Sequence, residues 1–192
     1  MPQPPSVPGD PPQGETLSTS RGFDGAWIHV RVDQVRLPSG RITTRETVEH
    51  PGSVAIVGVT TEGEVLLLRQ THHTIGQTLL GLPAGTLEPG ESPEACARRE
   101  LVEETGYRAG RLTQLASYFT SPGYTDERLT IFRADACAPA GGAIDPDELI
   151  RLAPTPLADI PSLVEPGPGQ LVDAKTLIGL LLLLRDLRRR PS

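Results

Sequence analysis

The sequence lacks the features that mark several classes of protein. Its 192 residues include two cysteines, too few for a disulfide framework. The longest apolar run lies within residues 177–184, far short of the roughly 18 residues that a membrane-crossing helix needs. No basic segment followed by an apolar stretch opens the chain, so no export signal is visible. These absences predict a cytoplasmic protein with no membrane partner.

An excess of basic residues is also missing. The formal net charge is -6, and the arginines are scattered except for a group in residues 185–190. A nucleic-acid-binding surface would need a basic stripe, so no polynucleotide partner is expected. With 37% hydrophobic residues the chain is long enough to bury one core. Residues 1–20 are rich in proline and poor in large apolar side chains, which predicts a flexible tail.

The rest of the chain alternates between strand and helix patterns. Residues 27–35 and 42–48 predict a hairpin with its turn at 39–40, which makes residues 21–50 a small N-terminal β element. Within residues 51–192, strands are predicted over 53–59, 64–69, 79–82, 112–119 and 129–136. Helices are predicted over 93–105, 156–164 and 172–189. This order predicts an α/β fold, a sandwich with a mixed sheet.

The helix predicted over residues 93–105 carries the strongest chemical signal. Ser92 suits the N-cap, Pro93 the first helical position and Gly106 the stop. Its three glutamates at helical spacing, Glu100, Glu103 and Glu104, share one face. Like charges at this spacing destabilise a helix unless water or a cation offsets their repulsion. The pattern is therefore compatible with a solvated acidic face and with a cation site. Mg²⁺ typically binds carboxylate oxygens together with phosphate oxygens of a substrate.

The spacing around these glutamates decides between the two interpretations. The chain reads Gly85, five residues, Glu91, seven residues, Arg99-Glu100-Leu101, one residue, Glu103-Glu104, one residue and Gly106. A chance match of this kind has a frequency on the order of one in ten million. The pattern is the Nudix box in full, and the chain from Trp27 onward resembles the ADP-ribose pyrophosphatase branch of the Nudix hydrolases. Further stretches that resemble this branch are residues 48–52, 82–85, 121–127 and 173–176.

The resemblance implies a Nudix-type α/β/α sandwich, with the N-terminal β element helping to form a homodimer. Glu100 and Glu104 would be the main ligands of Mg²⁺, with Mn²⁺ as the alternative ion. Glu103 would be a third ligand, directly or through water, and the carbonyl of Ala84 a further one. The structural positions of the box would be Gly85, Glu91, Arg99 and Gly106, with Glu91 and Arg99 paired to each other.

The resemblance also implies a general base in a late loop. Residues 141–148 contain Asp145, Asp147 and Glu148, of which Glu148 is the preferred assignment. A metal-ligand role for Glu148 is equally compatible. Glu103 is the other residue assigned to the catalytic machinery.

Substrate identity rests on other positions. Pro122, sixteen residues after Gly106, matches the marker of a preference for ADP-ribose, whose hydrolysis would give AMP and ribose 5-phosphate. Other substrate contacts would be Trp27, Arg45, Arg69 and Glu127. For Trp27, core or dimer packing is preferred over stacking on the adenine.

The sequence departs from this branch at residues 71–73, where an aromatic and a basic residue are usual, and at Gly81, where a glutamate is usual. Another nucleoside diphosphate derivative, such as a nucleotide sugar, therefore stays open as substrate. A nucleotide-binding domain without hydrolysis is disfavoured because the carboxylates of the box are intact.

Overall fold

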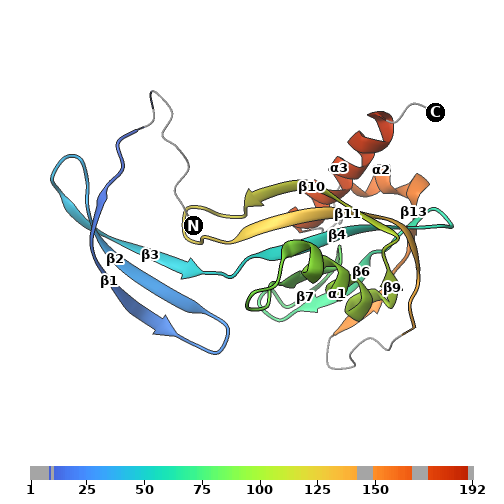
Figure 1. Cartoon of the computed structure of the whole chain (residues 1–192), viewed down its shortest axis with the longest axis horizontal. Coiled ribbons are helices and arrows are strands. Elements are labelled where there is room, and N and C mark those ends of the chain that lie inside the picture. Colours follow the sequence, from blue (N-terminus) through green and yellow to red (C-terminus); the bar gives the residue numbers. More distant parts are fainter. Residues whose placement is uncertain (1–8, 10, 142–148, 166–172, 190–192) are drawn as a thin grey trace. The chain divides into compact units, whose positions relative to one another are not determined.

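The computed structural model describes residues 9, 11–141, 149–165 and 173–189. Its contacts divide the chain into two compact units (Figure 1). The first unit consists of residues 1–50 and 120–127, and the second of residues 51–119 and 128–192.

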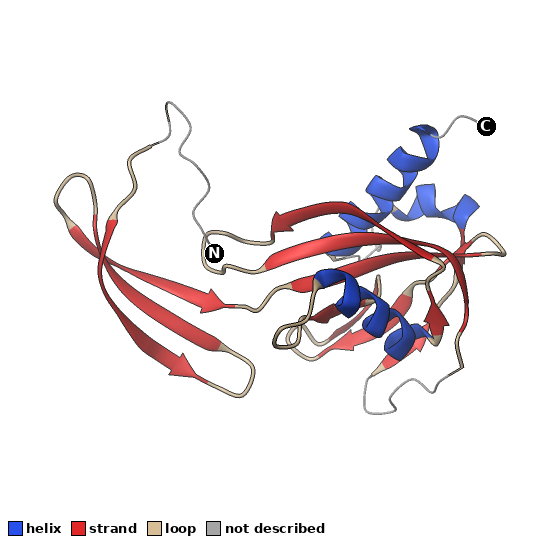
Figure 2. Cartoon of the chain, viewed as in Figure 1, coloured by secondary structure: helices blue, strands red, loops and turns tan. Residues whose placement is uncertain are grey.

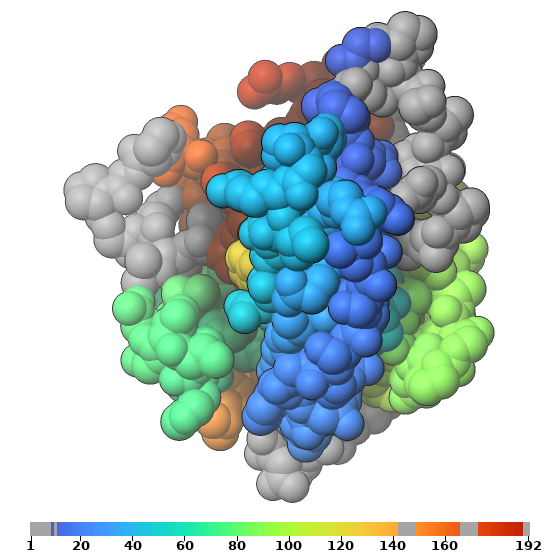
Figure 3. All heavy atoms as spheres, turned by 90° about the vertical axis from the view of Figure 1, so that its left-hand side faces the viewer, coloured from blue at the N-terminus to red at the C-terminus, as the bar shows by residue number. Residues whose placement is uncertain are grey.

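The first unit is built on a three-stranded antiparallel sheet. Strands β1 (Glu15–Asp24), β2 (His29–Arg36) and β3 (Ile42–Glu49) are paired in that order and lie side by side in the space-filling view (Figure 3). The turn between β2 and β3 falls where the sequence predicts it. Gly40 adopts a φ of 84°, which favours glycine, and its N–H donates to the carbonyl of Leu37 at 2.8 Å.

Strand β1 corrects the predicted flexible tail, because it begins at Glu15 and occupies residues that the sequence assigned to that tail. Every residue of β1 is exposed, so the strand has no apolar alternation that sequence reasoning could detect. Backbone pairing with β2 holds it, and Glu15 faces Arg36 across the ladder with a 2.7 Å ion pair. An edge strand of this kind is fixed by its neighbour.

Trp27 also lies in a different place from the one expected. It lies in the turn between β1 and β2, outside the strands, and its exposed fraction is 91%. The expectation that Trp27 packs in the core of this chain is therefore wrong.

The second unit contains a mixed sheet and a smaller antiparallel sheet. The mixed sheet runs β10 (Arg111–Phe119), β11 (Arg128–Pro139), β4 (Ser53–Thr60), β5 (Glu64–Val65), β13 (Thr155–Pro156). Strand β8 (Ala84–Thr86) pairs with β4, and β9 (Tyr107–Arg108) pairs with β11. The central pair, β11 and β4, is parallel. The smaller sheet has the order β12 (Ile150–Leu152), β6 (Leu68–His72), β7 (Gln77–Gly81).

Helices cover both faces of the mixed sheet (Figures 1 and 2). On β4, Val54 and Ile56 pack with helix α1 (Pro93–Thr105), whereas Ala55 and Val57 pack with helix α3 (Ala174–Arg189). Successive side chains of a strand point to opposite faces of the sheet, so a strand buried on both faces packs against one helix with every second residue and against the other helix with the rest. The short helices η1 (Leu157–Asp159) and α2 (Ile160–Leu163) join the α3 side. The predicted α/β/α sandwich with a mixed sheet is confirmed.

Several element boundaries follow the sequence closely, and others do not. Helix α1 has the predicted limits, and α3 ends at the predicted Arg189 but begins at Ala174, after the non-helical Asp173. The strand predicted over 64–69 is divided into β5 and β6, with the fully buried Leu66 and Leu67 between them. The helix predicted over 156–164 is a 3-10 turn followed by one turn of α-helix. None of the helices in the described segments is long and apolar enough to cross a membrane.

Candidate active site

Helix α1 is fixed at both ends by the predicted residues. The side chain of Ser92 accepts a hydrogen bond from the N–H of Ala95 at 3.2 Å, and Pro93 opens the helix. Gly106 ends it with a φ of 71° and donates to the carbonyl of Val102 at 2.9 Å. This geometry sets the rotation of the helix, and with it the direction in which its glutamates point.

Glu100 and Glu104 are buried against strand β8. Their exposed fractions are 9% and 5%, which is unusual for carboxylates. The N–H of Ala84 donates to Oε2 of Glu104 at 2.8 Å. At Gly85, an added Cβ would lie 1.9 Å from the carboxyl carbon of Glu100. The sequence therefore needs glycine at position 85 to leave room for this carboxylate.

Arg99 joins the acidic residues of the box. Its Nε and Nη2 donate to the two carboxylate oxygens of Glu91 at 3.0 and 2.9 Å, so the pair expected from the sequence is present. Nη1 donates to Glu100 at 2.7 Å and to Glu103 at 3.0 Å. The guanidinium therefore offsets the repulsion that three neighbouring carboxylates would otherwise suffer.

These contacts shift the pKa values of the network. The hydrogen bond from Arg99, and next the backbone N–H of Glu88, lower the pKa of Glu91 to about 2. Hydrogen bonding to Glu91 is also the main cause that raises the pKa of Arg99 above its ordinary value. Both groups are charged over the whole physiological range.

The donor set fits a hard divalent cation in its chemistry. Glu100, Glu104 and the carbonyl of Ala84 supply oxygen, and Mg²⁺ typically takes one or two carboxylates together with water and phosphate oxygens. In the described part of the chain, no three His, Cys, Asp or Glu side chains are already grouped to hold a metal ion. Arg99 binds Glu103, which is half-exposed, so the third carboxylate is engaged with the guanidinium.

Four of the expected substrate residues lie in the first unit: Trp27 in the turn between β1 and β2, Arg45 on β3, and Pro122 and Glu127 in residues 120–127. Arg45 lines a concavity of about 610 Å³ with residues of β2, β3 and the 120–127 segment. Glu127 accepts a hydrogen bond from the hydroxyl of Thr120 at 2.7 Å, and Pro122 lies between them in the same segment. Tyr124, which the sequence analysis passed over, lines the concavity and accepts a backbone hydrogen bond from Val48 at 2.8 Å.

Arg69 is not brought together with the glutamates. It is exposed on β6, where Arg151 of β12 is its register partner. Leu152 packs on the cluster that includes Leu101 of α1, so alternation turns its neighbour Arg151, and with it Arg69, to the opposite face of that sheet. Glu148, with Asp145 and Asp147, lies outside the described residues. The position of the expected general base is therefore not described.

Gly81 lies next to polar groups at the start of the C-terminal helix. A Cβ at Gly81 would meet Oδ2 of Asp173 at 3.4 Å and Oγ1 of Thr176 at 3.5 Å. Thr176 in turn accepts a hydrogen bond from the N–H of Leu82 at 2.9 Å. A carboxylate thus approaches the backbone where the sequence departs from the ADP-ribose branch, and it belongs to Asp173, which directly precedes α3.

The two cysteines take no part in this chemistry. Both are buried, and desolvation by burial is the main cause that raises the pKa of Cys96 to about 12 and of Cys137 to about 11. Thiols with such pKa values are inert as nucleophiles at neutral pH.

Comparisons with known proteins place this site in a family. Residues 49–174 match the NUDIX domain, and residues 15–48 match the nucleoside diphosphate sugar hydrolase N-terminal domain. An ADP-ribose pyrophosphatase of Bacillus subtilis is 39% identical over 84% of this chain and 88% of its own. A methanol dehydrogenase activator of Bacillus methanolicus is 34% identical over 86% of this chain and 90% of its own.

The fold agrees with a solved structure described as an ADP compounds hydrolase. Its TM-score is 0.80 at 24% sequence identity, and the match covers 92% of this chain and 95% of that one. With the domain match over most of the chain and the box geometry on α1, the protein belongs to the NUDIX family of hydrolases.

Proposed function

We propose that this protein hydrolyses the diphosphate linkage of ADP-ribose to AMP and ribose 5-phosphate. The observation that carries the proposal is the burial of Glu100 and Glu104 against Ala84 and Gly85, a pair of carboxylates retained at a cost that a cation would offset. The Bacillus subtilis relative named ADP-ribose pyrophosphatase supports the substrate.

In this proposal Glu100, Glu104 and the carbonyl of Ala84 hold Mg²⁺, or Mn²⁺, and Glu103 is a further ligand. When bound, such a cation neutralises the diphosphate and stabilises the charge that develops on the leaving phosphate. Arg99 donates hydrogen bonds to Glu100 and Glu103 and holds their carboxylates in place, while its pair with Glu91 anchors the loop before the helix. Glu148 takes the proton of the attacking water.

The remaining assignments concern recognition. We propose Trp27, Arg45, Pro122 and Glu127 as substrate contacts. The chain is proposed to act as a homodimer in the cytoplasm on a small-molecule substrate, and the free, buried state of both cysteines agrees with a reducing compartment.

A nucleotide sugar is the second candidate substrate. Two observations favour it: the N-terminal unit matches a domain named for nucleoside diphosphate sugar hydrolases, and residues 71–73 and Gly81 depart from the ADP-ribose branch. The carboxylate of Asp173 beside Gly81 changes the shape and charge of that position.

The test is hydrolysis of a substrate panel by the full chain with Mg²⁺: ADP-ribose, nucleotide sugars, dinucleoside polyphosphates and nucleoside triphosphates, with release of monophosphate as the readout. We expect ADP-ribose to have the highest kcat/KM. Glu104→Gln is expected to lower turnover by orders of magnitude, because it removes one ligand charge and little volume. Glu94→Gln is the matched control, since Glu94 is exposed on the same helix and pairs with Arg98.

Preferred hydrolysis of a nucleoside triphosphate would refute both substrate assignments. Near-normal turnover of the Glu104→Gln variant would refute the metal role of that residue. Binding of ADP-ribose by metal-loaded protein without turnover would refute the proposal that the protein is an enzyme.

A further inference from the structure

Two arginines oppose each other on the sheet face that the proposed active site does not use. In the antiparallel pair of β6 and β12, Arg69 and Arg151 are register partners. Directly opposed residues of an antiparallel pair project from the same face, and like charges in this position destabilise the pair. Opposed arginines therefore need a reason to be retained.

Among the described residues, neither guanidinium has a hydrogen bond or an ion pair. By contrast, Arg111, which is exposed on β10, forms an ion pair with Asp135 at 3.1 Å. Arg69 and Arg151 thus project from directly opposed positions, and neither has a carboxylate partner among the described residues. An anion between them would turn repulsion into attraction.

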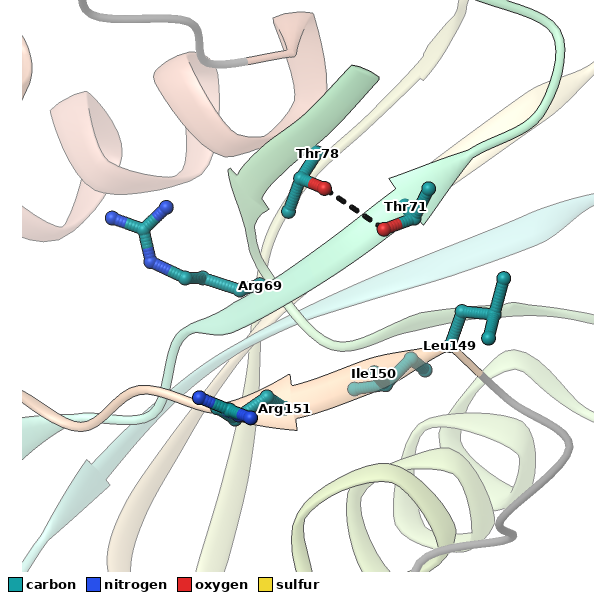
Figure 4. A pocket seen from close by; sticks show the side chains of 6 residues that line it. All are labelled: Arg69, Thr71, Thr78, Leu149, Ile150 and Arg151. Atoms are coloured by element: carbon teal, nitrogen blue, oxygen red, sulfur yellow. Dashed lines mark hydrogen bonds between the residues drawn. The ribbon is translucent and has the colours of Figure 1, made fainter. Parts of the chain in front are cut away.

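The surroundings form a pocket of mononucleotide size. The pocket has a volume of about 480 Å³ and is lined by Arg69, Thr71, Thr78, Leu149, Ile150 and Arg151. Figure 4 shows the two arginine side chains extending from neighbouring strands, with the two threonines farther along β6 and β7. The hydroxyls of Thr71 and Thr78 are 2.8 Å apart and form a hydrogen bond. One hydroxyl donates to the other in this bond, and the second hydroxyl keeps its own hydrogen to donate to a ligand.

We propose that this pocket binds a phosphate monoester. The phosphate dianion would lie between Arg69 and Arg151, because a planar guanidinium forms strong, paired hydrogen bonds with phosphate oxygens. Thr71 and Thr78 add hydroxyl contacts, and Leu149 and Ile150 offer an apolar wall to the rest of the ligand. Arg69, which resemblance implied as a substrate contact, belongs to this second site.

Two kinds of phosphate compound have this chemistry: inorganic phosphate and an organic monoester. The proposed reaction would release two monoesters, AMP and ribose 5-phosphate, so a product could occupy the pocket. That last connection rests on the proposed function, whereas the arginine pair and its pocket do not.

The experiment is isothermal titration of the full chain with inorganic phosphate, AMP and ribose 5-phosphate, with and without Mg²⁺. We expect saturable binding that needs no Mg²⁺ and that weakens about tenfold or more in Arg151→Gln and in Arg69→Gln. Arg108→Gln removes the same charge from an exposed position on β9 and is expected to leave the affinity unchanged. Binding should strengthen as pH rises through about 6, where a monoester becomes a dianion.

Glu104→Gln separates this proposal from the proposed function. Full retention of the Mg²⁺-independent binding in that variant assigns the binding to the arginine pocket, even if ADP-ribose proves not to be the substrate. Equal affinity for the three ligands identifies phosphate itself as the ligand, and tighter binding of AMP or ribose 5-phosphate identifies a monoester. Absence of saturable binding by all three, or unchanged affinity in both arginine variants, overturns the proposal.

Discussion

At the scale of single residues, the most constrained position is Gly85. Any side chain there would overlap the carboxyl group of Glu100, which is itself buried. We expect Gly85→Ala to lower turnover by orders of magnitude while the protein stays folded, because the displaced group is a proposed ligand and not part of the apolar core. Steady-state kinetics with a thermal unfolding curve would show this, and Thr86→Ala, on the same strand, is the control. Unchanged turnover would contradict the placement of Glu100.

The pair of Glu91 and Arg99 leads to a prediction about pH. The folded-state pKa of Glu91 is about 2, below its ordinary 4.5, so the pair stabilises the fold fully above pH 4.5. That contribution is lost as pH falls from 4.5 toward 2. We expect Glu91→Gln to be less stable than the wild type at pH 6 and to approach it at pH 2–3.

Urea unfolding at both pH values measures this difference. Glu94→Gln, whose carboxylate forms an exposed ion pair with Arg98, is expected to show a smaller change between the two pH values. A constant gap between Glu91→Gln and the wild type would mean that the pair does not depress the pKa as described.

At the scale of elements, α3 packs very closely on the sheet at Gly179. A Cβ there would lie 2.5 Å from Cδ1 of Leu82 and 3.1 Å from Cγ2 of Val57. Alanine gains about 1 kcal/mol of helix propensity, but overpacking a close-packed core costs typically 1–3 kcal/mol. We therefore expect Gly179→Ala to lower the free energy of unfolding by about 1 kcal/mol. Arg185→Ala, exposed on the same helix, should be nearly neutral, and a stabilised Gly179→Ala variant would refute the close approach.

At the scale of the whole molecule, the first unit exposes many apolar side chains for its size. They are Leu17, Phe23, Trp27, Ile28, Ile42 and Tyr124. A three-stranded sheet whose first strand is exposed throughout has little core of its own, which favours association with another surface. We expect the protein to sediment with twice the mass of its 20.5 kDa chain at micromolar concentration.

Charge placed in this surface tests the dimer. Ile42→Asp is expected to shift the protein toward the monomer in sedimentation velocity, because burying an unpaired carboxylate is costly. Ile75→Asp is the control, since Ile75 is equally exposed but lies in the second unit. A wild-type monomer, or equal effects of both substitutions, would contradict dimerisation through the first unit.

The sequence by itself determined the features that depend on local chemistry. Ser92, Pro93 and Gly106 fixed the limits of α1, and the spacing of Gly85, Glu91 and the helix glutamates identified the family. The alternating and apolar runs predicted most of the strands, because the order of polar and apolar residues reflects which side chains of a strand are buried.

Tertiary structure alone decided the features that depend on a neighbour distant in the chain. Strand β1 forms because β2 pairs with it, and Trp27 is exposed because the chain turns there. The opposition of Arg69 and Arg151 follows from the register of strands 82 residues apart in sequence, a relation that no local pattern contains. The spacing of the glutamates on α1 could be recognised in the sequence. Their burial could not, because it depends on β8 packing against the helix.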